Sequence, residues 1–521
     1  MYGLQVLAGA VALLFIRYLI YPVVYYYVDR KCLRRYPNMS AFSGITNIPF
    51  MIEASRGFRS HRLAELHKKH PVVRIGPNSL SYGSVGAIKD IYGHGTKCSK
   101  DDFYALVSGT HFHLADVIDK AEHQRKRKVL SSAYAISNLE GWEHKVTDKI
   151  ERLVKHFDAH CTNPLAKDHT PDPSELTVDY RAWTNFFTMD AILDIGLSQP
   201  AGFLDRGDDE VVCERVDGST CTVGYRDVLH SQMTAQSQLI WAYDWYHLLS
   251  SWSRVFSNKF RTLLGKGAHF DGIVLHQLRK RFKRYQEGEI LQDFFQALME
   301  NRYGTPHMLP WGELAAELSI MLNAGSVSTA IAINNTMYLL LKHPRCLAKL
   351  REEIDSVCDE SEAALPYEKV KYLPYLRACV DEAMRVLPPT SFGLPRKTPP
   401  EGCAILGEFV AGNTSVSMSS YVAHRDSQVF CDPELFLPER WLGEEGKTLQ
   451  PYFITFSAGA RGCIGRNISY LEQLTLTASM VHRYEFALPS STWEQHRYEH
   501  FNLVPGPMPL KIWKRPKSAD D

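Results

Sequence analysis

The sequence lacks several patterns that would assign it quickly to a class. Its 11 cysteines run from Cys32 to Cys463 without one C-x-x-C pair, so neither a zinc ribbon nor a thioredoxin-type site is indicated. Their number is odd and their spacing irregular, which fits a reducing compartment better than a disulfide framework. The sequence has no internal repeat and no low-complexity tract. One large domain is therefore the economical interpretation of its 521 residues.

An excess of charge is also lacking. The formal net charge is +1, which gives no reason to expect nucleic acid or another polyanion as a partner. Hydrophobic residues make up 45% and charged residues 22% of the chain, as in an ordinary globular protein. The 24 Phe, 26 Tyr and 9 Trp suit a core that encloses an apolar ligand.

Charge is scarcest at the N-terminus, where Arg17 is the only charged residue between Met1 and Val28. A run of this length can cross a hydrocarbon core of about 30 Å, and the basic residues at positions 30, 31, 34 and 35 predict that its C-terminal side faces the cytoplasm. A cleavable signal peptide is the weaker alternative, because no basic segment precedes the run. We expect a transmembrane anchor over 1–28, a basic and Pro/Gly linker over 29–50, and a single domain over 51–521.

The pattern after the linker is mostly helical. Short β-type runs occur at Val72–Ile75 and Ser79–Tyr82, and helical periodicity then dominates from about 116 to about 359. The acidic, glycine-rich stretch Gly207–Gly224 predicts a surface loop, and Leu318–Leu341 predicts a long apolar helix. The expected fold class is mainly α with small β-sheets. An interfacial aromatic patch is a further hypothesis, with core aromatics as its alternative, for Trp241, Tyr243, Trp245, Tyr246 and Trp252.

The most informative segment is Phe456–Gly465, FSAGARGCIG, which precedes a helical pattern. Its three glycines allow a tight turn around Cys463, and a thiolate at a helix N-terminus is stabilised by the dipole and by free N–H groups. Two other interpretations stay open from the residues alone. A glycine-rich loop can cradle phosphate, although no Lys-Ser/Thr follows here, and most cysteines are buried structural thiols.

This loop resembles the haem-binding signature of the cytochrome P-450 superfamily, Phe-x-x-Gly-x-Arg-x-Cys-x-Gly, at every defined position. The resemblance implies the cytochrome P-450 fold and haem b as the cofactor, with Cys463 as the thiolate ligand of the iron. It also implies that Phe456 packs near the sulfur and that Arg461 pairs with a haem propionate. The resemblance extends from about Tyr36 to about Trp513.

Two further motifs occur in the family's order. Glu382 and Arg385 lie three residues apart on a predicted helix, where such a pair is usually solvated and contributes little. The segment FLPERW follows at 436–441 and contains Arg440. In the family these motifs form a buried Glu–Arg–Arg network that braces the cysteine loop, and the resemblance assigns that role to Glu382, Arg385 and Arg440.

The propionate anchors are also implied by resemblance. The family places an aromatic residue or His four residues before an Arg on an early helix, and His123 and Arg127 match this pattern. Basic side chains can pair with carboxylates, although a solvated basic face is the alternative here. Arg396, in the segment Leu394-Pro-Arg, resembles a further propionate contact.

One departure from the family pattern concerns oxygen activation. The long helix has Val327 where the family usually has Asp or Glu, and Ser328 at the alcohol position, followed by Thr329. The acid and the alcohol normally help to deliver protons, and a valine can neither donate nor accept one. We expect Ser328 and Thr329 to carry the catalytic role that remains.

The resemblance implies an oxidoreductase of the monooxygenase type that inserts one atom of O₂ into an apolar small molecule. Electrons would come from an NADPH-cytochrome reductase, with cytochrome b5 as a further candidate partner. The protein would be a single-pass membrane protein of the endoplasmic reticulum that faces the cytoplasm. Its general similarity is to fungal membrane-bound members that oxidise aromatic compounds or act in secondary metabolism. The alternatives are a haem-thiolate isomerase or dehydratase without oxygen insertion and a membrane-tethered haem sensor.

No residue of the sequence identifies the substrate. By family position the pocket is expected within Phe103–His113, the helix around Asn323, Thr390–Leu394 and the turn near Leu503–Val504. The individual candidates are Phe112, Asn323, Ala324, Phe392, Leu394 and Val504.

Overall fold

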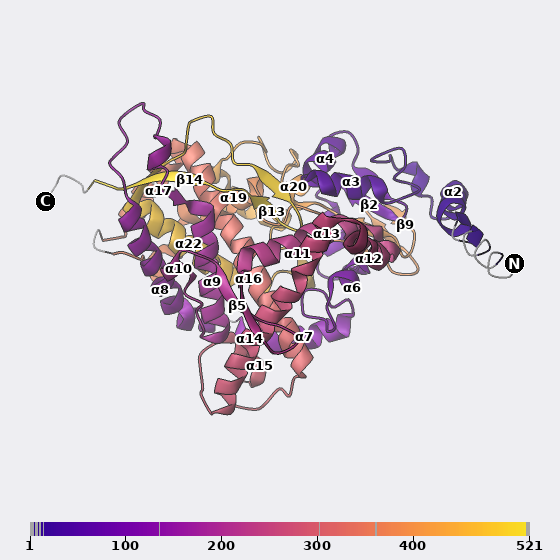
Figure 1. The fold of residues 1–521 in the computed structure, drawn as a ribbon. Helices are drawn as coiled ribbons and strands as arrows, with labels where there is room; N and C mark the ends of the chain where they lie inside the picture. Colours follow the sequence, from indigo (N-terminus) through magenta and orange to yellow (C-terminus); the bar gives the residue numbers. More distant parts are fainter. Residues whose placement is uncertain are drawn as a thin grey trace.

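A 32-residue helix, α16 (Trp311–Lys342), runs through the centre of the molecule (Figure 1). It packs against helices from both halves of the chain, α9 (Tyr180–Leu197), α19 (Pro374–Val386) and α22 (Arg466–Arg483) among them. Its residues are apolar around most of the circumference, and a helix of that kind is stable when it is buried on all sides. In this computed structural model the chain is described for residues 15–134, 136–301, 303–359 and 362–516, and for residues 5, 9, 12 and 13.

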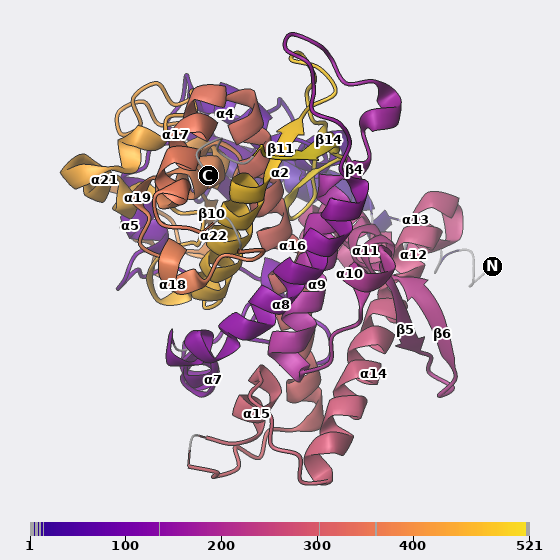
Figure 2. The ribbon, with the colours of Figure 1, turned by 90° about the vertical axis from the view of Figure 1, so that its left-hand side faces the viewer.

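Helices surround α16 on most sides (Figures 1 and 2). The remaining helices of eight or more residues are α2 (Tyr21–Val28), α3 (Ile48–Arg56), α4 (Arg59–His67), α7 (Lys120–Ala133), α8 (Ile136–His160), α11 (Tyr225–Leu239), α12 (Tyr246–Phe256), α13 (Asn258–Gly265), α14 (Gly267–Gln286) and α17 (Pro344–Asp355). The shorter ones are α5 (Ala87–Tyr92), α6 (Phe103–Val107), α10 (Phe203–Arg206), α15 (Phe294–Met299), α18 (Tyr367–Val370), α20 (Ser420–Ala423) and α21 (Gly443–Leu449).

The β-structure is small and lies at the edges of the helical body. A five-stranded sheet has the order β1 (Val72–Gly76), β2 (Ser79–Tyr82), β10 (Ser415–Ser417), β7 (Arg396–Lys397) and β3 (Ser99–Lys100). A three-stranded sheet has the order β11 (Tyr484–Ala487), β14 (Pro509–Lys514) and β4 (Val178–Asp179). Three hairpins complete the set: β5 (Glu210–Glu214) with β6 (Thr220–Gly224), β8 (Cys403–Ile405) with β9 (Glu408–Val410), and β12 (Arg497–Glu499) with β13 (Leu503–Pro505).

The predicted elements are largely confirmed. Both early strands are present, and the long apolar helix ends at Lys342, one residue before His343 and the proline that begins α17. The surface loop expected at Gly207–Gly224 was wrong, because this stretch forms the β5–β6 hairpin (Figure 2). Val211 and Cys213 alternate with exposed residues and are buried, and β5 packs against α14.

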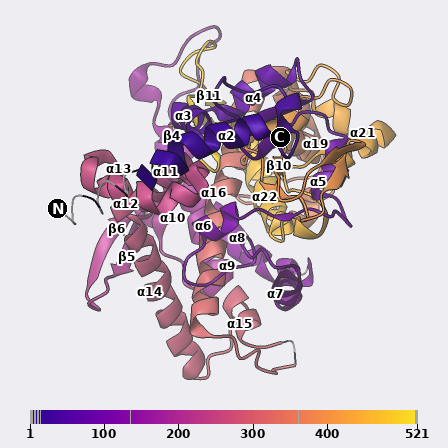
Figure 3. The same ribbon diagram turned by 90° about the vertical axis from the view of Figure 1, so that its right-hand side faces the viewer.

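The N-terminal segment is helical where it is described. The π-helix η1 (Ile16–Ile20) continues into α2, which Figure 3 shows in front of the body of the molecule. Most apolar side chains of both helices are exposed. Several residues of the predicted anchor, 1–4, 6–8, 10, 11 and 14, lie outside the described residues. Within the described part, the helix long and apolar enough to span a membrane is α16, and 61% of its most apolar window is buried in the protein. The helix that passes this test of length and composition, α16, is therefore mostly buried in the core of the protein.

Candidate active site

The cysteine loop (Phe456–Gly465) closes on itself just before α22 begins. The Cys463 N–H donates to the Phe456 carbonyl at 2.9 Å, and a 3-10 turn at Gly459–Arg461 lies between them. Gly459 has a φ of 64°, and a Cβ at this position would lie 2.3 Å from the Tyr92 carbonyl oxygen. Only glycine fits there, so the loop holds the Cys463 side chain in one direction.

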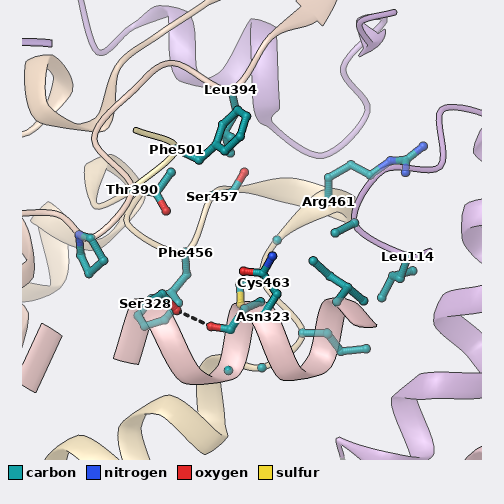
Figure 4. A pocket seen from close by; sticks show the side chains of 18 of the residues that line it. Leu114, Asn323, Ser328, Thr390, Leu394, Phe456, Ser457, Arg461, Cys463 and Phe501 are labelled. Atoms are coloured by element: carbon teal, nitrogen blue, oxygen red, sulfur yellow. Dashed lines mark hydrogen bonds between the residues drawn. The ribbon is translucent and has the colours of Figure 1, made fainter. Parts of the chain in front are cut away.

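The Cys463 side chain faces a cavity of about 520 Å³ (Figure 4). The thiol is exposed to this cavity and surrounded by protein elsewhere, so burial raises its pKa, against the opposing effect of the Gly465 and Arg466 N–H groups. A thiolate without a partner is therefore disfavoured in this position. A metal ion that binds the sulfur would keep it deprotonated.

Basic side chains line the same cavity and have no carboxylate partner within the described part of the chain. They are Lys100, His123, Arg127, Arg396 and Arg461. Arg461 donates instead to the Val117 carbonyl at 2.7 Å and to the Ile118 carbonyl at 2.9 Å. Arg127 donates to the Gly462 carbonyl at 2.8 Å.

The electrostatics of this basic cluster reflect burial and mutual repulsion. Burial, and then the neighbouring Arg396, lower the pKa of Arg461 to about 10. Burial, and then Arg461, lower the pKa of His123 to about 4, so its ring is neutral at pH 7. Burial, and then Arg396 and Arg461, also lower the pKa of Lys100. Positive charge that is buried and unpaired is costly, so this end of the cavity is suited to an anionic ligand.

A buried carboxylate network lies behind the cysteine loop. Glu382 accepts from Arg385 Nη2 and Nε on its two oxygens, each at 2.8 Å, and from Arg440 Nε at 3.1 Å. The Trp441 Nε1–H and the Leu437 N–H also donate to it, at 2.8 and 2.9 Å. Glu382, Arg385 and Arg440 therefore lie in one hydrogen-bonded network, which also holds the backbone N–H of Leu437.

Comparison with known proteins agrees with this geometry. The model of the Cytochrome P450 family matches residues 44–512. The chain belongs to this family. Among curated proteins it is similar to the cytochrome P450 monooxygenase cicH of Emericella nidulans, with 30% identity over 94% of this chain and 96% of that protein. It is also similar to the cytochrome P450 monooxygenase hepC of Aspergillus oryzae (28%, over 92% and 93%) and to the benzoate 4-monooxygenase bphA of Aspergillus niger (28%, over 89% and 90%).

P450 enzymes are haem-thiolate oxidoreductases, and the cavity fits that cofactor. A thiol faces the cavity from the cysteine loop, and Arg127, Arg396 and Arg461 of the basic cluster are cations without carboxylate partners in the described residues, as the two propionates require. Phe456 lines the cavity beside Cys463 and packs on Tyr470, with ring centroids 5.2 Å apart. The donor set and the charge of the lining residues thus match the group that the family requires.

On α16, this P450 has a valine, Val327, at the position where the family pattern has Asp or Glu. Val327 is buried and lines the cavity. Ser328 Oγ donates to the Ala324 carbonyl one turn back, at 2.8 Å. Thr329 Oγ1 donates to Ser469 Oγ at 2.9 Å, and Ser469 also accepts from Gln473 Nε2 at 3.0 Å. Both alcohols therefore line the cavity with their protons directed to protein acceptors.

Four of the six candidate substrate residues line the cavity: Asn323, Ala324, Phe392 and Leu394. Phe112 does not, because its side chain is 41% exposed at the surface. Val504 does not either, because it lies in β13 and pairs with Tyr498 of β12. Phe501 and Asn502, just before β13, line the cavity instead.

Besides Phe501 and Asn502, sequence reasoning missed Lys100, Trp441 and His424. Lys100 faces Arg396 across the β3–β7 pair, and the Trp441 indole donates to Glu382. His424 accepts the Ile454 N–H at 3.0 Å, two residues before Phe456. Trp441 directly follows Arg440 in the FLPERW motif, so an indole donor could have been expected. No local pattern marks the other two.

Proposed function

We propose that this P450 monooxygenase inserts one oxygen atom into an apolar, aromatic small molecule in fungal secondary metabolism or aromatic-compound oxidation. An NADPH-dependent reductase would supply the electrons. The observation that carries the proposal is the Cys463 thiol, which faces a cavity whose wall is mostly apolar away from the basic cluster. The relatives named as monooxygenases support the reaction type, and the relative named benzoate 4-monooxygenase supports an aromatic substrate.

The chain's own residues have separable tasks in this reaction. Haem, when bound, supplies the activation of O₂ and the transfer of one oxygen atom. Cys463 would hold the iron, and Arg127, Arg396 and Arg461 would hold the propionates. Ala324 lines the cavity and takes little of its space, since its side chain ends at Cβ. Gly325 leaves room for the Ile192 side chain of α9, which a Cβ at this position would meet at 2.6 Å. Ser328 offers the lone pairs of its hydroxyl to the cavity, so that it can hold a water that carries protons.

The haem assignment is tested with the purified protein. The reduced protein with carbon monoxide is expected to show the red-shifted Soret band of a thiolate-ligated haem, and Cys463→Ala is expected to lose that band. A band that persists in Cys463→Ala would contradict the role of this cysteine. Oxidation of substrate that depends on NADPH and a reductase separates an enzyme from a membrane-tethered haem sensor.

A reaction without net oxygen insertion is the second candidate, and Val327 is the observation that favours it. Among the described residues no carboxylate lies in the α16 groove at that position, so proton delivery depends on hydroxyl groups and water. An isomerase or dehydratase at the same haem would not need that delivery. Incubation under ¹⁸O₂ distinguishes the two, because a monooxygenase product contains one labelled oxygen and an isomerase product contains none.

We also propose that the protein is anchored in the endoplasmic reticulum membrane with its catalytic domain toward the cytoplasm. The apolar run of residues 1–28 and the basic residues after it support an anchor. The Tyr18 ring lies 3.6 Å from the Trp245 ring between centroids, which places η1 beside the turn before α12. Helix α12 adds Trp252, 58% exposed, and Phe256, 82% exposed.

The interfacial aromatic patch proposed for the five residues from Trp241 to Trp252 does not include all of them. Trp241 and Tyr246 are buried in the core, because Trp241 packs on Phe50 and Phe103. Trp252 lies outside the core and contributes to the proposed membrane contact together with Leu248 and Phe256.

A further inference from the structure

Asn323 presents an amide to the cavity that has no hydrogen-bond partner among the described residues. It lies on α16 one helical turn before Val327 and lines the cavity (Figure 4). The two other amide side chains in the lining lie against protein hydroxyl groups: Asn502 donates to Thr390 Oγ1 at 3.2 Å, and Gln236 lies beside the Tyr246 hydroxyl. The polar neighbours of Asn323 on α16 are also satisfied, because Ser326 and Ser328 donate to backbone carbonyls.

A wall of three phenylalanines lines the same cavity. Phe103 belongs to α6, Phe392 follows α19, and Phe501 precedes β13, and their ring centroids are 6.0 to 6.3 Å apart. The Trp241 ring stacks behind Phe103 at 5.0 Å. Rings at these separations favour edge and offset contacts with a further aromatic ring. Because the rings come from three elements and support one another, the wall is formed before a ligand binds.

The Asn323 amide and the phenylalanine wall restrict the ligand in different ways. A ligand that fills the cavity removes water from the Asn323 amide, and an amide that loses water without gaining a partner is destabilised. A purely hydrocarbon ligand therefore leaves Asn323 unsatisfied. A hydroxyl group can donate to the amide oxygen or accept from the amide nitrogen, so it can satisfy either end of this side chain.

We propose that Asn323 is a specificity-determining residue that hydrogen-bonds a phenolic hydroxyl of the substrate, while the substrate ring packs against Phe103, Phe392 and Phe501. This inference rests on the proposed function, since it names the substrate class of that site. Four residues of helix separate Asn323 from Val327, a rise of about 6 Å. The hydroxyl is thus held about one helical turn from the position where the family's acid would stand.

The test measures ligand binding by the purified, haem-loaded ferric protein. The probes are phenylimidazole and its meta- and para-hydroxyphenyl analogues, whose imidazole nitrogen binds haem iron and shifts the Soret band. At least one hydroxyl analogue is expected to bind about tenfold more tightly than phenylimidazole, a difference of about 1.4 kcal/mol. Asn323→Leu keeps the approximate volume and is expected to remove this preference while the affinity for phenylimidazole changes by less than about threefold.

Asn502→Leu is the matched control, because it removes a cavity amide that already has a protein partner. The hydroxyl preference is expected to survive in that variant. Equal affinities in the wild-type protein, or a preference that persists in Asn323→Leu, would overturn the inference. If Asn323→Leu fails to fold, Asn323→Ala replaces it.

The carbon monoxide spectrum separates this inference from the proposed function. A wild-type protein without the thiolate band contradicts the haem-thiolate assignment itself. A protein with the band and without the hydroxyl preference contradicts only the role of Asn323.

Discussion

Glu382 and Arg385 form a fully buried bidentate ion pair three residues apart on α19. Burying two charges is costly, and their attraction offsets the cost only when further hydrogen bonds satisfy both groups. Here that condition is met, since Arg385 also donates to the carbonyls of His424, Pro433 and Leu435. The pair thereby connects α19 to the chain that leads into the cysteine loop.

Removal of one partner is expected to disrupt this connection. Glu382→Ala leaves Arg385 and Arg440 without their carboxylate, and we expect it to destabilise the protein by about 3–5 kcal/mol, as for other broken buried pairs. Haem content is expected to fall with it. Urea unfolding and the carbon monoxide spectrum measure the two effects.

The control for this variant is an exposed pair of the same spacing. Glu444 and Lys447 are three residues apart at the surface, with side chains 87% and 73% exposed. Glu444→Ala is expected to change stability by less than about 0.5 kcal/mol. If both variants lost the same stability, the network around Glu382 would not brace the loop.

The parts of the site that follow from the sequence are those encoded locally. The cysteine loop needs its glycines within ten residues of one another, and the pair on α19 needs only helical spacing. Trp441 directly follows the predicted Arg440. Each of these residues could therefore be placed before the fold was known.

The remaining parts depend on register between distant segments. Lys100 faces Arg396 because β3 pairs with β7, almost 300 residues later, and no local pattern determines that pairing. The same reason explains why Phe501 and Asn502 replace Val504 in the cavity. The Gly207–Gly224 stretch was wrongly expected to be a loop because its glycines and acids outweighed the alternation of Val211 and Cys213.

The hydroxyl groups of α16 are expected to affect coupling, which is the amount of product formed per NADPH consumed. With Val327 unable to carry a proton, Ser328 is the alcohol that can hold water in the groove, and its bond to Ala324 is local. We predict that Ser328→Ala lowers product per NADPH severalfold, as loss of a positioned proton-transfer group does, and increases released hydrogen peroxide. Haem binding is expected to be unchanged.

Thr329→Ala provides the comparison. Its hydroxyl donates to Ser469, which also accepts from Gln473 in the core, so these bonds form no path to solvent among the described residues. We therefore expect a smaller loss of coupling than in Ser328→Ala. Coupling near the wild-type value in Ser328→Ala would show that this hydroxyl only satisfies a backbone carbonyl.

Deletion of Met1–Val28 is expected to move much of the protein from the membrane fraction to the soluble fraction. Haem binding is expected to persist, because the segment that follows is fixed to the domain by Lys31, which donates to Asn78 at 2.7 Å and to the Asn413 carbonyl at 2.8 Å. Fractionation and the carbon monoxide spectrum measure the outcome. Loss of the band in the truncated protein would mean that residues 1–28 belong to the fold.

Residual membrane attachment of the truncated protein is expected through α12. Exposed apolar side chains such as Trp252 and Phe256 insert readily at a membrane interface. Replacing Trp252 and Phe256 by Ser in the truncated protein is expected to release the protein that is still bound to the membrane. Replacing Val216, exposed in the β5–β6 turn outside α12, should leave attachment unchanged.

His424 is expected to make the protein sensitive to acid. Its Nε2 accepts the Ile454 N–H, so the ring must be neutral, and burial, followed by the charges of Arg385 and Arg425, lowers its pKa to about 3. In the unfolded chain a histidine has a pKa of about 6.5. The stability that depends on neutral His424 is therefore present above about pH 6.5 and is lost as the pH falls toward 3. Between pH 7 and pH 5 this loss amounts to about 2 kcal/mol.

A comparison with His424→Gln isolates this contribution. Glutamine can accept the Ile454 N–H through its side-chain oxygen and does not titrate, so the loss of unfolding free energy between pH 7 and pH 5 should be smaller than in the wild-type protein by about 2 kcal/mol. Other histidines whose pKa is lowered by desolvation, such as His230, are present in both proteins and cancel in the difference. His61→Gln, at an exposed position, should follow the wild-type curve. Parallel curves for wild type and His424→Gln would mean that another group controls the acid sensitivity of the protein.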